Sequence, residues 1–167
     1  RELDEHIAWC DQRIAVHAKD NAAVKKAATL IGIGPVTASA AVATVVDFKQ
    51  FKNGAQFGAW IGLVPRQDSS GGKNRLGRIT KRGDTYLRTM LIQGAKSAVM
   101  TAHKRSDPIS QWTAALRDRS GWQKAVVALA NKNARILWAV MTKGEAFNAR
   151  HVSVQPGAAM AATAAST

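Results

Sequence analysis

The chain has 167 residues, 46% of them hydrophobic, which is enough to bury the core of one domain and excludes a wholly disordered protein. Its 24 Lys and Arg outnumber 11 Asp and Glu, and this net charge of +13 favours nucleic acid as a partner, with an anionic membrane surface as the competing partner. No apolar run approaches the roughly 18 residues of a membrane-spanning helix, so we expect no membrane span.

The numbers and positions of cysteine and histidine limit which disulfides and metal sites this chain can form. The single cysteine, Cys10, excludes an intrachain disulfide and fits a reducing compartment, and we predict that it packs on the first helix. Four scattered histidines show no metal-ligand spacing, so we expect no metal or other cofactor bound by this chain itself. The polar, acidic start has no signal peptide and no initiator Met. We therefore expect a fragment or processed product in the cytoplasm.

The first 26 residues are predicted to be helical. A helical stripe recurs at spacings of four and three residues, at Leu3, Ile7, Cys10, Ile14 and His17. Such a narrow stripe fits pairing with a helix of this chain or of a second copy, and it fits equally an ordinary amphipathic helix on its own core. The first 20 residues carry five acids and three bases, so the positive charge lies in the rest of the chain.

A tight turn is predicted at Gly32-Ile33-Gly34-Pro35, between an apolar helix end and a helix from Val36 to Val46. The pattern resembles a helix-hairpin-helix motif, whose turn amides and following helix N-terminus hold a DNA phosphate. Gly32 and Gly34 are therefore candidate DNA-binding residues. The alternative is a turn without function. Thr37 stands where a dinucleotide-binding fingerprint needs its third glycine, which excludes that motif.

The next segment combines an aromatic cluster with a basic stretch. Four aromatic residues around a short helix at 54–61 are predicted to be core rather than a platform for stacking bases; they are Phe48, Phe51, Phe57 and Trp60. From Arg66 to Arg88 the chain then has seven Lys or Arg and two acids, around Ser69-Ser70-Gly71-Gly72. We predict an irregular loop or short hairpin here.

Hydroxyls and glycines within a cationic stretch suit a phosphate backbone, since positive charge attracts it and glycine lets the main chain approach. The candidate phosphate-binding side chains are Lys73, Arg75, Arg78, Lys81, Arg82 and Arg88. The alternative is a solvated basic loop. A Walker A motif is excluded, because Asn74 follows Lys73 where that motif needs Ser or Thr.

Three further helices complete a mainly α-helical domain. Asp84 is the predicted N-cap of a helix through about His103, and Asp107 caps another that begins at Pro108 and ends near Ser120. The last helix, from Trp122 to Met141, is predicted to bury four residues: Val126, Leu129, Ile136 and Val140. From about Val152 the chain is rich in Ala, Ser, Thr, Gly and Pro, which predicts a disordered tail.

The ordered set of motifs resembles a known family. It runs from the Gly32-Pro35 turn through FGAWIGLVP, SSGGK, GRITKRG and YLR to KAVVALAN and ARILW. It is similar to the C-terminal transposase domain of bacterial insertion-sequence transposases that join a RuvC-like DEDD domain to a serine-bearing domain. The resemblance divides the chain into the end of a coiled-coil-like helical linker (1–26), the transposase domain (27–147) and a tail (148–167).

The resemblance implies a DNA recombinase guided by an element-encoded bridge RNA. It implies that the serine before the first glycine, Ser70, is the nucleophile, with Ser69 as the runner-up, and forms a phosphoserine link to the cut strand. Acids of the RuvC-like domain would bind magnesium, with protomers assembled around the DNA. This chain departs from the family by lacking that domain, so we expect it to bind nucleic acid and to be inactive alone.

Two other functions compete with this interpretation. The first is a non-catalytic helix-hairpin-helix DNA-binding module in which the basic segment only clamps phosphates. The second is a helical assembly module that forms multimers through the first helix. No His or carboxylate is an obvious general base beside the serines; Asp68 is close only in sequence.

Overall fold

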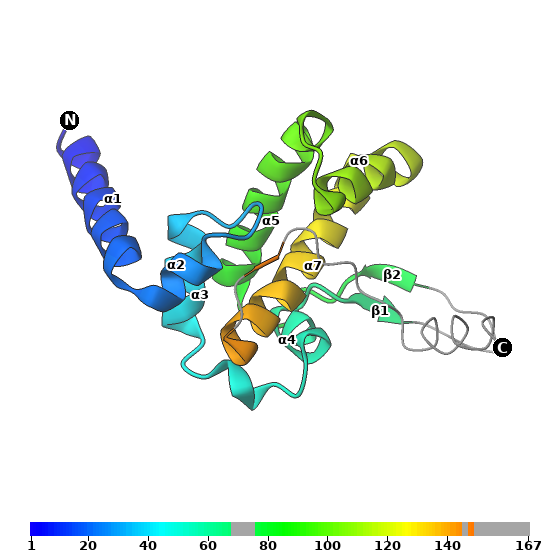
Figure 1. Ribbon diagram of the computed structural model, residues 1–167, viewed down its shortest axis with the longest axis horizontal. Coiled ribbons are helices and arrows are strands. Elements are labelled where there is room, and N and C mark those ends of the chain that lie inside the picture. Colours follow the sequence, from blue (N-terminus) through cyan, green and yellow to red (C-terminus); the bar gives the residue numbers. More distant parts are fainter. Residues whose placement is uncertain (68–75, 145–146, 149–167) are drawn as a thin grey trace, which may run out of the picture.

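The computed structural model describes residues 1–67, 76–144 and 147–148 of the chain. These residues form a mainly helical domain with one two-stranded sheet, as the sequence predicted (Figure 1). The predicted tail from Val152 lies outside the described residues. None of the helices in the described part is both long enough and apolar enough to cross a membrane.

The N-terminal helical segment is broken in two, so the prediction of one helix through Lys26 is wrong. Helix α1 covers Glu2–Asp20 and α2 covers Ala22–Ala27. The break has a local cause: the side chain of Asn21 accepts hydrogen bonds from the amides of Ala23 (2.9 Å) and Val24 (3.1 Å). A side chain that satisfies free amides in this way caps a new helix.

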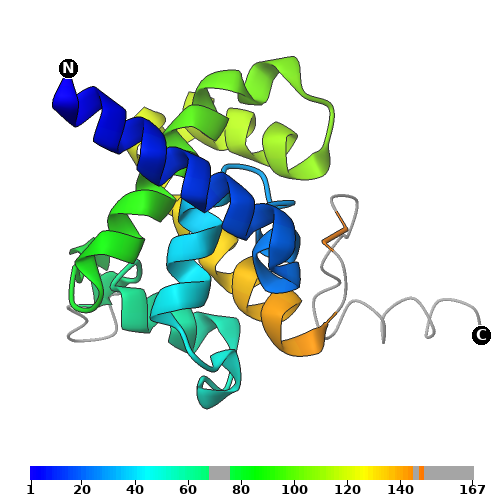
Figure 2. The same cartoon turned by 90° about the vertical axis from the view of Figure 1, so that its left-hand side faces the viewer.

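Helix α1 is covered by its own chain only near its C-terminal end. Leu3 and Ile7 are 75% and 56% exposed, whereas Ile14 is half-buried. His17 lies 3.3 Å from the hydroxyl of Ser39 in α3 (Pro35–Thr44), and Figures 1 and 2 show α1 extending beyond the helices that it contacts. Within the described residues, the structure therefore leaves every position of the predicted stripe except Ile14 exposed. Cys10 is exposed, so the prediction that it packs is wrong.

The aromatic cluster is core, as predicted. It surrounds α4 (Gly54–Ile61) and the short 3-10 helix η1 (Phe48–Gln50). The ring of Phe57 is fully buried, with ring centroids of Phe48 and Phe51 at 5.3 and 5.1 Å. Trp60 stacks on Phe57 at 6.0 Å and is 38% exposed, so it forms the outer edge of the cluster.

Three helices build the rest of the body: α5 (Thr85–Thr101), α6 (Pro108–Ser120) and α7 (Trp122–Lys143). The short helix η2 (Ala102–Lys104) follows α5. Both predicted N-caps are confirmed, because Asp84 accepts from the amide of Leu87 (2.6 Å) and Asp107 accepts from the amide of Ser110 (2.9 Å). Proline at the first position of α6 fits its fixed backbone angle.

Helix α7 is central, since it contacts α2, α4, α5 and α6 (Figure 1). Val126, Leu129 and Val140 are buried as predicted, whereas Ile136 is half-buried and its neighbour Leu137 is fully buried. In that turn of α7 the buried position is therefore Leu137, one residue after the predicted Ile136.

The predicted short hairpin is present. Strand β1 (Pro65–Gln67) pairs antiparallel with β2 (Leu76–Ile79), with Pro65 opposite Ile79 and Gln67 opposite Leu76. The unequal spacing between these two pairs marks an irregularity in the ladder. The sheet projects from the helical body near α4 and α7 (Figure 1).

Candidate nucleic-acid interface

The base of the β-hairpin is fixed to the end of α4 by main-chain hydrogen bonds. Gly62 ends α4 in a left-handed conformation (φ +81°), and its carbonyl accepts from the amide of Lys81 (3.1 Å). The carbonyl of Val64 accepts from the amide of Thr80 (2.9 Å). The chain therefore leaves and returns to the helical body at one place, where the hairpin cannot pivot without breaking these bonds.

A close backbone crossing fixes the same place. Gly83 has a φ of +116°, and a Cβ on it would overlap the carbonyl oxygen of Trp60. A Cβ on Gly62 would likewise meet the main chain of Arg82, whose nitrogen would be 2.7 Å away. Only glycine allows two backbones to approach so closely, so both glycines of this crossing are structural.

Two side chains from the helices hold the strand side of the crossing. Asn131 of α7 donates from Nδ2 to the carbonyl oxygen of Leu63 (3.0 Å). Arg88 of α5 donates from its guanidinium to the carbonyl oxygen of Ile61 (2.9 Å) and to the hydroxyl of Thr85 (3.1 Å). A cation at the C-terminal end of α4 also interacts favourably with the helix dipole.

Arg88 therefore departs from its predicted place among phosphate-binding side chains. It is 8% exposed, and its guanidinium is occupied by groups of the protein itself. A buried charge of this kind is held by its partners, and its removal would leave the Ile61 carbonyl without its donor. We assign Arg88 to the support of the hairpin base.

The other cations at the hairpin base are exposed. They are Arg66 on β1, Arg78 on β2, and Lys81 and Arg82 between β2 and α5. The three ion pairs found within the described residues involve other cations. Unpaired exposed cations close together produce a positive potential that attracts a polyanion.

The backbone at Lys81 is unusual, because this is the one non-glycine residue with a positive φ (+55°) in the part of the chain that the structure describes. Such a conformation costs of order 1 kcal/mol for a residue with a Cβ. It is maintained by the Lys81–Gly62 hydrogen bond and by the crossing at Gly83. The direction of the Lys81-Arg82 segment is thus set by the helical body.

The predicted nucleophile falls outside the residues that the structure describes. Ser70 and its runner-up Ser69, with Lys73 and Arg75, belong to residues 68–75, which connect β1 to β2 and lie outside the described residues. The structure therefore brings together Arg78, Lys81 and Arg82 at the base. Their relation to the serines stays a prediction.

The turn between α2 and α3 is held against the body as well. Gly32 has a φ of +81°, and a Cβ on it would lie 2.8 Å from the carbonyl oxygen of Gly94 in α5. Asn133 of α7 donates to the carbonyl oxygen of Ile31 (2.8 Å). Gly34 is exposed and begins α3 without a side-chain cap. The two predicted glycines therefore differ: Gly32 packs on α5, whereas Gly34 is open to solvent.

Sequence reasoning missed Asn131, Asn133 and Gly94. The sequence did contain a signal for Asn131 and Asn133, because both lie about one turn from apolar positions of a long helix. A polar side chain that faces a core requires a hydrogen-bond partner, often a backbone group. Gly94 gave no signal, since a glycine within a helix pattern does not reveal what approaches it. Within the described residues, His, Cys, Asp and Glu side chains nowhere gather in threes or more where a metal ion could bind.

The fold and this site together define a basic helical domain that presents a rigidly based hairpin beside exposed cations. Residues 24–111 match the sequence profile of the IS116/IS110/IS902 family of transposases, and the chain belongs to this family. The match includes the glycine turn, α3, α4, the hairpin and α5.

Similar curated proteins carry related names. The chain is 48% identical over 141 residues to a probable family 20 transposase of Pseudomonas aeruginosa, covering 84% of this chain and 42% of that protein. It is 42% identical over 144 residues to the transposase for insertion sequence element IS1111A of Coxiella burnetii, covering 86% and 40%. A third relative, the transposase for insertion sequence element IS1328 of Yersinia enterocolitica, is 37% identical over 87% of this chain and 44% of its own length. The chain thus spans about two fifths of the length of these relatives.

Proposed function

We propose that this chain is the DNA-handling part of an insertion-sequence transposase and that its β-hairpin presents a serine to a phosphodiester. The observation that carries the proposal is the cluster of exposed cations at a rigid hairpin base, for which the described residues provide no ion pair, in a chain of this family. Arg78, Lys81 and Arg82 would hold the DNA backbone, with release of its counterions.

Ser70 is the proposed nucleophile. Its Oγ attacks the phosphorus, forming an O–P bond while one P–O bond to a neighbouring deoxyribose oxygen breaks. The serine proton leaves to solvent or a base, and the departing oxygen takes up a proton. A serine hydroxyl is a weak nucleophile at neutral pH, so charge stabilisation at the attacked phosphate is needed. Arg75, Arg78 and Arg82 would supply it.

The proposed reaction needs more than this chain. Within the described residues no acidic cluster suits a metal ion, so magnesium does not fit this part of the protein. We propose that a RuvC-like domain of the same transposase supplies the acids, and that a bridge RNA pairs with the DNA substrates. The isolated chain would bind DNA without cutting it.

A second candidate function is a non-catalytic DNA-binding module. It is favoured by the exposed, uncapped N-terminus of α3 at Gly34 and Pro35, which follows a helix-hairpin-helix-like turn. In this case the basic hairpin would only clamp phosphates, and Ser70 would be a polar loop residue.

Ser70→Ala separates the two candidates. In a transposase that includes this segment and its acid-bearing domain, Ser70→Ala should retain DNA affinity while strand transfer is lost. Arg82→Gln is the matched control, because it should weaken binding and reduce its salt dependence by about one counterion. Strand transfer at the unmodified rate by Ser70→Ala and Ser69→Ala would leave the binding module as the better account.

We also propose that the protein forms homo-oligomers through α1. The uncovered apolar stripe at Leu3 and Ile7 supports this, because it continues the half-buried positions Ile14 and Ala18 along one side of the helix. A second copy of α1 carries the same spacing and would cover it.

A further inference from the structure

An open pocket of about 340 Å³ lies at the end of α5 that is distant from the hairpin. One wall is the turn after α2, at Thr29 and Gly32, and the other is the last turns of α5, at Ser97 and Thr101. Arg105, which follows η2, closes one side. The pocket brings together two segments that are distant in the sequence, 29–32 and 97–105, and the proposed chemistry of the hairpin uses neither of them.

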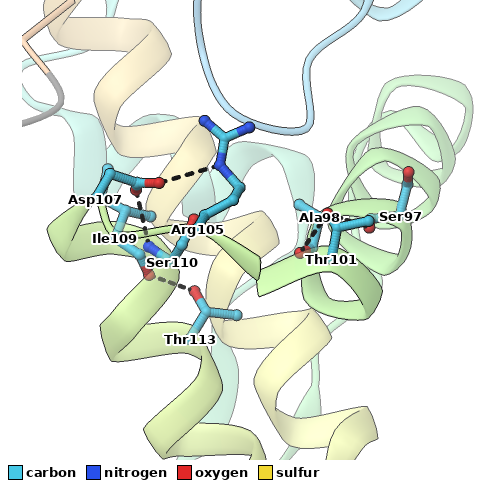
Figure 3. A network of polar contacts seen from close by, with 8 residues as sticks. All are labelled: Ser97, Ala98, Thr101, Arg105, Asp107, Ile109, Ser110 and Thr113. Carbon is cyan, nitrogen blue, oxygen red and sulfur yellow. Dashed lines mark hydrogen bonds and ion pairs between the residues drawn. The ribbon is translucent and has the colours of Figure 1, made fainter. Parts of the chain in front are cut away.

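Arg105 is held in place by one edge only. Its Nε donates to Oδ2 of Asp107 (3.1 Å), and Asp107 is itself held by the amide of Ser110 (2.9 Å). Figure 3 shows the two terminal nitrogens of Arg105 directed away from Asp107, on the side of the pale-blue turn. The guanidinium is thus oriented, and its terminal donors remain available to a ligand. This is the arrangement that binds phosphate oxygens well.

The pocket's other groups favour an oxyanion with attached hydroxyl or sugar groups. Ser97 is exposed, and its hydroxyl is free to donate. The hydroxyl of Thr101 already donates to the carbonyl oxygens of Ser97 (3.2 Å) and Ala98 (3.3 Å), so its oxygen remains an acceptor (Figure 3). Gly32 keeps the turn free of a side chain on this wall. Asp107 is the nearby acid, and its charge faces Nε of Arg105.

A second cation lies beside Arg105 in the sequence. Lys104 of η2 is exposed directly before it. Helix α5 separates this pocket from the hairpin base, and its 17 residues span about 25 Å at 1.5 Å per residue. Contact at both ends of α5 would therefore need a nucleic acid that spans at least this length.

We propose that this pocket is a second phosphodiester-binding site, in which Arg105 and Ser97 hold a backbone phosphate of the DNA that the hairpin cations also contact. The inference rests on the proposed function, because it assumes that the chain binds DNA. It adds a contact point on the opposite end of α5, and it assigns Arg105 as a binding residue.

Two matched pairs of variants test the site by fluorescence anisotropy with a labelled 20-base-pair DNA duplex across a salt series. In the first pair, Arg105→Gln is compared with Arg117→Gln, because Arg117 is also paired with a neighbouring carboxylate (Asp118, 3.0 Å) but lies outside the pocket. Arg105→Gln should weaken binding about five- to tenfold near 0.1 M salt and lower the salt slope by about one. Arg117→Gln should do neither.

The second pair replaces a neutral polar side chain by an acid. Ser97→Asp places an acid in the pocket, whereas Gln123→Asp places the same charge at an exposed position of α7. Only Ser97→Asp should weaken binding strongly. Equal effects within both pairs, at unchanged thermal stability, would overturn the pocket assignment alone. Absence of salt-dependent binding by the unmodified chain would instead overturn the proposed function, and the pocket assignment with it.

Discussion

The carbonyl oxygen of Trp60 occupies the space in which a side chain on Gly83 would begin. Trp60 lies in the last turn of α4, and Gly83 directly precedes the N-cap of α5, so their contact joins the two ends of the segment that forms the hairpin. The hairpin is therefore mounted on the helical core through direct backbone contact, which the side chains of Asn131 and Arg88 reinforce. This mounting gives the exposed cations fixed positions.

Gly83→Ala should destabilise the domain severely. The new Cβ would overlap the Trp60 carbonyl, and the φ of +116° is unfavourable for alanine, so we expect a loss of about 3 kcal/mol or more. The matched control is Gly144→Ala, which has a φ of +71° in the left-handed helical region but no atom within 4 Å of the new Cβ, and should cost about 1 kcal/mol. Urea unfolding of both variants measures the difference, and equal losses would show that the crossing is not tight.

Arg88 and Arg82 should separate stability from binding. Arg88→Gln removes a buried donor to the Ile61 carbonyl and should cost about 1.5–3 kcal/mol of unfolding free energy, with DNA affinity of the folded fraction unchanged. Arg82→Gln changes an exposed side chain, so its stability should stay within about 0.5 kcal/mol while DNA affinity falls. Chemical unfolding and anisotropy titration check both. The reverse pattern would return Arg88 to the phosphate-binding set.

The N-cap of α6 should make stability depend on pH. Burial raises the pKa of Asp107, but hydrogen bonds from Ser110 and the Arg105 charge outweigh it and lower the pKa below its ordinary value of 3.8. The ionised carboxylate therefore stabilises the fold above that value, and this contribution is lost as the pH falls through the lowered pKa.

Asp107→Asn keeps a capping side chain but loses the charge, so it should cost about 0.5–1 kcal/mol at pH 7. The difference from the unmodified chain should shrink as the pH falls below about 4. Asp118→Asn is the control, because its carboxylate is exposed near the C-terminal end of α6 and caps nothing. Thermal melting from pH 3 to pH 7 measures both, and a constant difference for Asp107→Asn would refute the assignment.

Association through α1 should depend on its exposed stripe. Ile7→Glu places a charge in the centre of the stripe and should shift any dimer towards monomer in sedimentation equilibrium. Val46→Glu introduces the same residue at a position that is 95% exposed and away from α1, and should leave association unchanged. A strict monomer for the unmodified chain at high concentration would contradict the proposal.

The features that were predictable from the sequence are those with local causes. Asp84 and Asp107 correctly predicted where their helices begin, because capping depends only on neighbours within one turn. The break at Asn21 was missed, because an asparagine within a periodic stripe is compatible with two outcomes. The helix can continue through it, or the asparagine can cap a new helix, as it does here. Arg88 was misplaced because nothing local distinguishes a buried arginine from an exposed one.

The parts of the site that depend on distant contacts were not predictable. The pocket at Arg105 requires the turn at Gly32 to lie against α5, and the partner of Gly32 is Gly94, 62 positions away in the sequence numbering. The sequence predicted either an irregular loop or a short hairpin, and the structure shows the hairpin. The hydrogen bond from Asn131 that attaches it to α7 was not predicted, because it depends on the fold.

The most direct test of the account is a search for a covalent protein–DNA adduct. A transposase that includes this segment and its acid-bearing domain is incubated with magnesium, bridge RNA and labelled donor and target DNA, and the products are separated on a denaturing gel. The account predicts an adduct that disappears in Ser70→Ala and whose DNA-linked peptide contains Ser70. An adduct that persists in Ser70→Ala but disappears in Ser69→Ala would move the nucleophile by one residue. DNA binding without any adduct would contradict the central claim.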